Sequence, residues 1–409
     1  MGREDMKIVT RGEVKMLGPQ AARVLREYNW RRSFTKAECL MKNDDHGTKG
    51  VTPPIIPYVR VQRSIVYYGN IENGSYNHHS QIAKFRGKYY LAWSNGIVNE
   101  EDAGQKVLIA SSDDCLTWSR AIPVLDCAPG EKTAHNCVAL YSDDSRMYIA
   151  VMTEETEHDA NSTGMRRIFP ETSVINIYAT TDGINWSGAY SFGDNVRWIF
   201  EAPRLTRDNR LMCVCKTKKH GPAVLLWPGK DICSDPEFIT VPEPEGASFP
   251  YAEASWYQVD DGRILVFWRD EGASCKLYVN YSDDGGNTFS PPVLSDIPDS
   301  MSKVYVGRLE DGRYYLCNNA VASLLDRGAL MLMLSNDGYR FDKVLMLNDD
   351  PVRMRRKGLL KTNGLQYPCC FVDGSRLIIA YDANKEDIMC DVIDTGKTPE
   401  VVLTLKEVL

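Results

Sequence analysis

The 409-residue sequence contains no apolar run of about 18 residues, so we expect no membrane-spanning helix and no membrane partner. Its 12 cysteines include no C-x-x-C pair, which argues against zinc-ribbon and thioredoxin-type sites. A net charge of −7 argues against a nucleic-acid partner. The first seven residues include Arg3, Glu4, Asp5 and Lys7, where a secretory leader needs an apolar stretch, so we expect a cytoplasmic protein with free thiols.

One short motif recurs along the chain. Residues 282–289 fit S-x-D-x-G-x-T-[WF] at every position, and residues 111–118 fit it with Cys in place of Gly. Shorter versions lie at 180–186 and 335–341, and a degenerate one lies at 234–238. Each copy separates two apolar runs, which is typical of a turn between strands, where Asp accepts hydrogen bonds from turn amides and Gly permits a positive φ. We expect these aspartates in turns on one rim of the fold: Asp113, Asp182, Asp283 and Asp337.

The repeats define the architecture. Their closing aromatic residues recur at multiples of about 50 residues, which is the period of a β-propeller blade. Six polar clusters, each followed by a strand, a turn and a very apolar strand, predict an all-β, six-bladed propeller of four-stranded antiparallel blades, with seven blades as the alternative. We expect residues 77–409 to form the propeller, with an insertion near 153–170. We expect residues 1–76, with a short helix over 20–28, to form an extension that packs on the propeller or closes it.

The Asp-box repeats and the six units resemble the sialidase superfamily. Sialidases of that superfamily carry an Arg-Ile-Pro motif at the start of the first inner strand, and one arginine of their carboxylate-binding triad comes from it. The matching place here reads Asn77-His78-His79-Ser80-Gln81, without an arginine. In this respect the first unit is more similar to propeller glycosidases and lyases that act on rhamnose–glucuronate linkages and use histidine early in the chain.

Topology indicates where the chemistry lies. The face opposite the Asp boxes gathers the starts of the first strands, the ends of the second strands and the connections that follow them. Polar and ionisable residues occupy these positions. The candidate catalytic residues are His79, His135, Glu201 and Glu253, and the candidate substrate-binding residues are His78, Asn95, Arg204, Lys216, Arg269, Lys303, Gln366 and Tyr367.

Residue chemistry assigns the roles. Because side chains alternate along a strand, only one of His78 and His79 is expected to face the axis, and we favour His79 as general acid or base. Glu201 or Glu253 would be the second catalytic group, as two carboxyl groups suit glycosidic cleavage. Arg204 and Arg269 would bind a carboxylate. We predict no cofactor and no metal. A metal site of His79, His135 and Glu201 stays open as the alternative, but propeller positions give no fixed ligand spacing that would indicate it.

We therefore expect a glycoside hydrolase that releases a terminal sugar from a small acidic oligosaccharide containing a uronic or a sialic acid. Two alternatives stay open. One is a lyase that acts on glucuronate, because β-elimination needs a base and a neutralised carboxylate. The other is a non-catalytic sugar-binding propeller, because the same turns also occur in proteins that are not enzymes.

Overall fold

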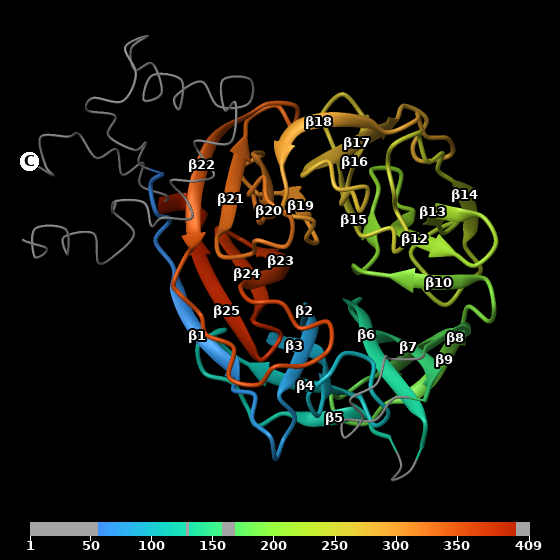
Figure 1. Cartoon of the computed structure of the whole chain (residues 1–409). Helices are drawn as coiled ribbons and strands as arrows, with labels where there is room; N and C mark the ends of the chain where they lie inside the picture. The colour runs from blue at the N-terminus through green and yellow to red at the C-terminus, as the bar shows by residue number, and fades with distance from the viewer. Residues whose placement is uncertain (1–55, 128–130, 158–167, 398–409) are drawn as a thin grey trace, which may run out of the picture.

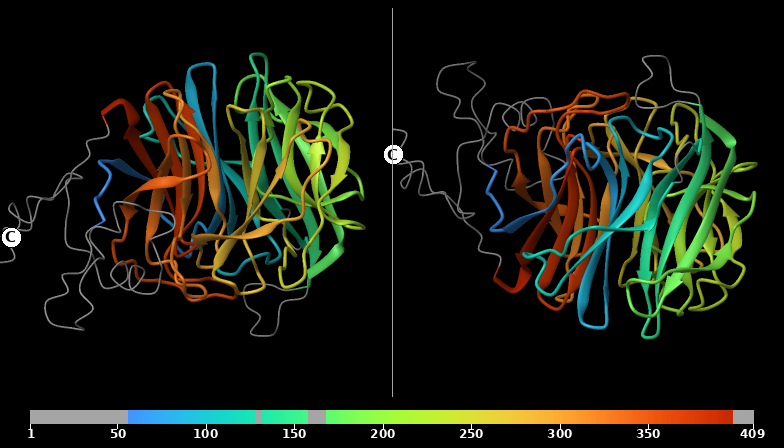
Figure 2. Two further views of the ribbon diagram at one scale, coloured as in Figure 1. Left: turned by 90° about the horizontal axis from the view of Figure 1, so that it is seen from above. Right: turned by 90° about the horizontal axis from the view of Figure 1, so that it is seen from below.

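Six antiparallel sheets form a closed ring in the computed structural model, which describes residues 56–127, 131–157 and 168–397. Figure 1 looks along the axis of the ring, and Figure 2 shows that the strands run between its two rims. The prediction of an all-β, six-bladed propeller is confirmed, and seven blades is wrong. The predicted helix over 20–28 and residues 158–167 of the predicted insertion lie outside the described residues. Over the described ranges, no helix has the length and apolar character needed to cross a membrane.

In five of the six blades the strands follow one another in the chain, and the sixth takes its outermost strand from the start of the described residues. From the axis outwards, the first blade contains β2 (Tyr76–Phe85), β3 (Lys88–Gly96), β4 (Lys106–Ser112) and β5 (Ile122–Leu125), and the second contains β6 (Thr133–Ser142), β7 (Met147–Thr156), β8 (Ile168–Thr180) and β9 (Ser187–Ser191). The third contains β10 (Val196–Ile199) with β11 (Arg204–Leu205), then β12 (Leu211–Thr217), β13 (Gly221–Leu226) and β14 (Glu237–Thr240), and the fourth contains β15 (Ala254–Gln258), β16 (Ile264–Trp268), β17 (Lys276–Ser282) and β18 (Val293–Pro298). The fifth contains β19 (Tyr305–Arg308), β20 (Tyr314–Asn318), β21 (Leu330–Ser335) and β22 (Phe341–Asn348), and the sixth contains β23 (Leu365–Asp373), β24 (Arg376–Ala383), β25 (Asp387–Asp394) and β1 (Gln62–Tyr67). A 3₁₀ turn, η2 (Thr395–Lys397), follows β25.

The core lies between neighbouring sheets. Every residue of β16 and of β21 is buried, because each of these strands has an adjacent sheet on both faces. This explains why the second and third strands read as continuous apolar runs rather than as alternating patterns. Each fully buried Leu, Ile or Phe contributes about 1.5–3 kcal/mol to folding.

The sixth blade is completed by a strand from the other end of the chain. β1 pairs antiparallel with β25, and Figure 1 shows the blue β1 beside the red β25. Arg63 on β1 donates from Nε and Nη2 to the two carboxylate oxygens of Asp391, at 2.7 and 2.8 Å. The Asp391 side chain is fully buried, so this bidentate pair links the two ends of the ring.

Replacing Arg63 by methionine should lower the free energy of unfolding by about 3 kcal/mol, because it leaves the Asp391 carboxylate buried without its cation. Urea denaturation monitors the loss. The matched control is Arg308→Met, since Arg308 pairs with Asp260 at the surface, where both side chains are exposed, and the expected loss is below about 1 kcal/mol. Equal losses in the two variants would contradict a closing role for the Arg63–Asp391 pair.

The Asp boxes lie in the predicted turns between third and fourth strands, with one shift in register. Asp182 and Asp337 accept hydrogen bonds from the amides two and three residues later. In the other two turns the accepting residue is one position after the aspartate that we expected. Asp114 accepts from the amides two and three residues later, and Asp284 from the amides three and four residues later. Asp113 and Asp283 instead pair with Lys88 and Arg263 at the surface.

Candidate active site

Tyr367, on the innermost strand β23, is the centre of a buried hydrogen-bonded group. Its hydroxyl donates to Glu253 Oε1 at 2.5 Å, although Glu253 precedes β15 two blades away. Arg269, which directly follows β16, places Nη1 2.8 Å from the Tyr367 oxygen and also donates to Glu253 Oε2. All three side chains are more than nine-tenths buried. In this group a hydroxyl donates a hydrogen bond to a carboxylate, and an arginine orients that carboxylate. This is the geometry of an activated nucleophile.

The protonation states suit that geometry. Burial by itself would raise the pKa of Glu253, but the Arg269 guanidinium and the Tyr367 hydroxyl bring this pKa below its usual value. Burial raises the pKa of Tyr367 well above 10, against the opposing effect of Arg269. At neutral pH Tyr367 is therefore a neutral hydroxyl beside an ionised carboxylate that can accept its proton.

Near the start of four innermost strands, either within the strand or just before it, one residue adopts the left-handed conformation. The residues are His79, Ala252, Met301 and Tyr367, with φ between 55° and 58°. In β2 and β23 the residue lies in a bulge that shifts the register with the next strand. Non-glycine residues in this conformation cost of the order of 1 kcal/mol each and gather at functional sites.

The bulge in β2 accompanies an arrangement in which both histidine rings pack against Tyr367. Alternation along a regular strand predicts one of the two, yet both rings lie against Tyr367, with centroids 4.1 Å (His78) and 5.7 Å (His79) from its ring. His78 Nδ1 lies 2.6 Å from Asp382 Oδ2, and burial lowers the pKa of His78 well below 6.5 while it raises that of Asp382 to about 8. Burial also lowers the pKa of His79 to about 4, so His79 is neutral at pH 7 and holds no extra proton for acid catalysis.

Three cations surround the Tyr367 ring. Arg269 bonds to its hydroxyl, the Arg327 guanidinium lies 5.4 Å from the ring centroid, and Lys385 Nζ lies 5.8 Å from it. Arg327 also donates to Gln366 Oε1 and, at 2.8 Å, to the carbonyl of Met301. The Nε atoms of Arg269 and Arg327 are buried and have no hydrogen-bond acceptor among the described residues. Unpaired donors on two guanidinium groups indicate a site for an anion.

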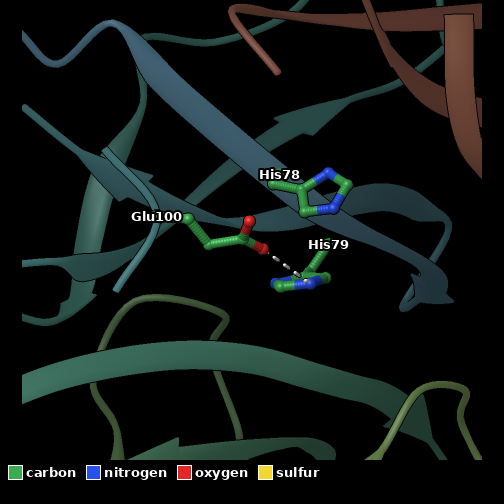
Figure 3. A group of neighbouring side chains, drawn as sticks. All are labelled: His78, His79 and Glu100. Carbon is green, nitrogen blue, oxygen red and sulfur yellow. Dashed lines mark ion pairs between the residues drawn. The ribbon is translucent and has the colours of Figure 1, made fainter. Parts of the chain in front are cut away.

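Glu100 connects the histidines to Lys385. Its Oε2 accepts a hydrogen bond from Lys385 Nζ at 2.7 Å, and its Oε1 lies 4.0 Å from His79 Nε2. Figure 3 shows the Glu100 carboxylate turned toward the two imidazole rings. Glu100 lies in the connection between β3 and β4, and Lys385 in the turn between β24 and β25.

Glu201 and Arg204 form a separate group. Arg204 Nη2 donates to Glu201 Oε2 at 3.0 Å, and the Ser255 hydroxyl donates to the same oxygen at 2.7 Å. Arg204 also donates to the carbonyl of Val306. These residues bind one another, and no hydrogen bond in the described part of the chain joins them to Tyr367 or Glu253.

The BNR repeat-like domain pattern matches residues 87–379, well over half of the sequence. The chain belongs to the BNR-repeat family. Among solved structures, a Dyadobacter fermentans protein of unknown function is 18% identical with a TM-score of 0.63, over 83% of this chain and 100% of that chain. The intramolecular trans-sialidase of Ruminococcus gnavus is 12% identical with a TM-score of 0.62, over 83% and 99%. A leech intramolecular trans-sialidase is 11% identical with a TM-score of 0.62, over 82% and 71%.

These likenesses show that the BNR-repeat protein has the fold of a sialidase-superfamily propeller. No curated protein matches the sequence.

The remaining predicted site residues of the BNR-repeat protein have contacts of their own outside the Tyr367 group. His135 Nδ1 is 2.8 Å from the Thr153 hydroxyl, and Asn95 donates to Asn77 Oδ1 at 2.8 Å. Burial lowers the pKa of Lys216, which lies opposite Trp198 in the third blade. Lys303 is 1% exposed, has no hydrogen bond or ion pair to a described residue, and lies with Nζ 5.8 Å from the Tyr305 ring.

Sequence reasoning missed four charged residues of the site. Arg327, Glu100 and Lys385 all come from connections between second and third strands, and Glu271 follows Arg269 in the same kind of connection. The sequence did contain a signal for these residues, because they are charged and lie in connections that the predicted topology places on the face opposite the Asp boxes. Their partners could not be predicted, because each pair joins segments far apart in the sequence.

Proposed function

We propose that this protein is a glycoside hydrolase that acts on a terminal sugar bearing a carboxylate, with Tyr367 as the nucleophile and Glu253 as its base. The observation that carries the proposal is the group formed by Tyr367, Glu253 and Arg269. In the first step the Tyr367 oxygen bonds to the anomeric carbon, its proton passes to Glu253, and the bond to the leaving sugar breaks. Water then releases the glycosyl group by the reverse sequence, so the anomeric configuration is retained.

A neutral hydroxyl suits an anionic sugar. A carboxylate nucleophile would repel a substrate carboxylate held nearby, whereas Tyr367 carries no charge until its proton moves to Glu253. Arg269 and Arg327 flank the tyrosine with unpaired Nε donors, so they are our candidates for binding the substrate carboxylate. We favour a uronic over a sialic acid, because His78 and His79 occupy the place where sialidases carry the Arg-Ile-Pro motif, which supplies one arginine of their carboxylate-binding triad. The trans-sialidase names of two similar structures support the sialic alternative.

Glu271 is our candidate for the acid that protonates the leaving sugar. Its Oε1 lies 3.7 Å from Arg269 Nη2, and its side chain is 15% exposed, compared with 4% for Glu253. Burial, with a smaller contribution from Glu253, raises the pKa of Glu271 to about 7. Glu271 is therefore largely protonated below pH 7 and loses its proton above it, so hydrolysis should fall as the pH rises through about 7.

Glu271→Gln should slow hydrolysis of a glycoside with an alkyl leaving group by about 10²-fold, and its rate should no longer fall near pH 7. A nitrophenyl glycoside should be affected far less, because nitrophenolate leaves without protonation. Rates measured against pH for the two substrates test this, with the exposed Glu237→Gln as control. An equal loss on both substrates would contradict the role as acid.

A substrate panel tests the proposed function. We would incubate the full chain with matched aryl glycosides of glucuronic acid, galacturonic acid, sialic acid and neutral glucose, and follow product formation by nuclear magnetic resonance. We expect release of one acidic sugar with retained configuration and no release from the glucoside. An unsaturated uronate product would identify a lyase instead, and binding of an acidic sugar without turnover would identify a sugar-binding propeller.

A further inference from the structure

We propose that His78, His79 and Glu100 form a binding site for a divalent first-row transition-metal ion of the Zn²⁺ type. Each residue offers one ligand atom, and these three atoms all lie within 4.8 Å of one another. Figure 3 shows the three side chains converging on the space between them. The inference goes beyond the proposed function, because it uses none of Tyr367, Glu253 or Arg269.

His78 has the environment of a metal-binding histidine. Its Nε2 is completely buried and has no hydrogen-bond partner among the described residues, although an unpaired buried ring nitrogen is costly. Its Nδ1 lies 2.6 Å from Asp382 Oδ2. A carboxylate on the far nitrogen is the usual support of a metal-binding imidazole, since it fixes the ring orientation. A cation at Nε2 replaces the proton there, and the hydrogen between Nδ1 and Asp382 stays in place.

His79 and Glu100 complete the site from two different segments. The bulge in β2 turns His79 to the same side as His78, and its Nδ1 lies 3.4 Å from the Ser94 hydroxyl. Its Nε2 then faces Glu100 Oε1 at 4.0 Å. The His79 and Glu100 side chains are 7% and 11% exposed, so a cation from solvent can approach from their side.

The donor set selects the class of ion. Two imidazole nitrogens and one carboxylate oxygen suit Zn²⁺ and its first-row neighbours, whereas Ca²⁺ and Mg²⁺ prefer oxygen ligands throughout. In a Zn²⁺ site each ligand atom lies about 2.0–2.2 Å from the ion, so the ligand atoms are closer to one another than these three are. To bind Zn²⁺, each side chain would move inward by roughly 1 Å. Three protein ligands leave a fourth position for water or a ligand.

Lys385 is the competitor for this site. Its ammonium holds Glu100 Oε2 at 2.7 Å, close to the place that a dication would occupy. The metal and the ammonium repel each other, so Lys385→Met should strengthen metal binding. If Glu100 served only as the partner of Lys385 and bound no metal, Lys385→Met would not strengthen metal binding.

Isothermal titration with ZnCl₂ tests the inference on the full chain after chelator treatment. We expect one equivalent to bind, at least tenfold weaker binding for Glu100→Gln and for His79→Gln, and tighter binding for Lys385→Met. His220→Gln removes an exposed histidine of the β12–β13 hairpin and should change nothing, which excludes adventitious histidine binding. Tyr367→Phe should also leave Zn²⁺ affinity unchanged, so failure of the proposed hydrolase does not affect this result.

The spectrum of the Co²⁺ protein gives a second measurement on the wild type, which stays decisive if a variant fails to fold. We expect visible ligand-field bands of a nitrogen and oxygen site, without the charge-transfer band of a thiolate. The inference is overturned if the wild type binds no Zn²⁺, if Glu100→Gln and His79→Gln bind it as tightly as the wild type, or if the Co²⁺ bands show cysteine ligands.

Discussion

Tyr367→Phe should reduce the turnover of an acidic glycoside by at least about 10³-fold while the protein keeps its fold. The change removes one oxygen atom, and with it the bonds to Glu253 and Arg269. Phenylalanine fills the same space and meets the same backbone requirement, since the positive φ of residue 367 burdens both side chains equally. The loss should therefore appear in kcat, with little change in the melting temperature.

Tyr339→Phe is the matched control for this variant. Tyr339 is exposed and donates its hydroxyl to Asp261 on the Asp-box rim, so its removal should leave turnover unchanged. Glu253→Gln should resemble Tyr367→Phe, because the amide cannot accept the phenolic proton as a carboxylate does. If Tyr367→Phe kept more than a tenth of wild-type turnover, the tyrosine could not be the nucleophile.

Arg327→Met should weaken binding of an acidic sugar by about 10- to 100-fold, which corresponds to roughly 1.5–3 kcal/mol for a charge-assisted hydrogen bond. The neutral counterpart of this sugar, in which the carboxylate is reduced to an alcohol, should bind to Arg327→Met almost as tightly as to the wild type. Arg327 is a cleaner choice than Arg269, whose removal would also leave Glu253 buried without its cation. Calorimetric titration with the two sugars measures the difference.

Arg308→Met is the control for charge, since Arg308 lies on the opposite rim and pairs with Asp260. It should bind both sugars like the wild type. An equal loss for the acidic and the neutral sugar in Arg327→Met would show that Arg327 orders the site through Gln366 and Met301, and does not contact the carboxylate.

The repeats made the fold predictable. Each Asp box is a local turn, so its residues report the strands on either side without any knowledge of distant contacts. Counting the turns and the polar clusters then fixes the number of blades, and the direction of each strand fixes the face to which a residue belongs. For this reason Glu253, Arg269 and Tyr367 could be assigned to one face from the sequence alone.

The pairing of those residues could not be predicted. Tyr367 and Glu253 are 114 positions apart and meet only because the ring closes, and nothing in either segment indicates the other. Arg204 donates to Glu201 in the structure, and its binding of a substrate carboxylate stays a prediction. The bulge at His79 likewise depends on neighbouring strands. Strand alternation predicted that one histidine faces the axis, whereas both rings pack against Tyr367.

Covalent trapping tests the central claim most directly. We would treat the wild type with fluorinated glycosyl fluorides of glucuronic, galacturonic and sialic acid, which form a glycosyl-enzyme quickly and release it slowly, and then map the label by peptide mass spectrometry. We expect one sugar per chain on Tyr367, from one of the acidic reagents, and no label in Tyr367→Phe. Turnover of the reagent with a label on a carboxylate, such as Glu253 or Glu271, would contradict it.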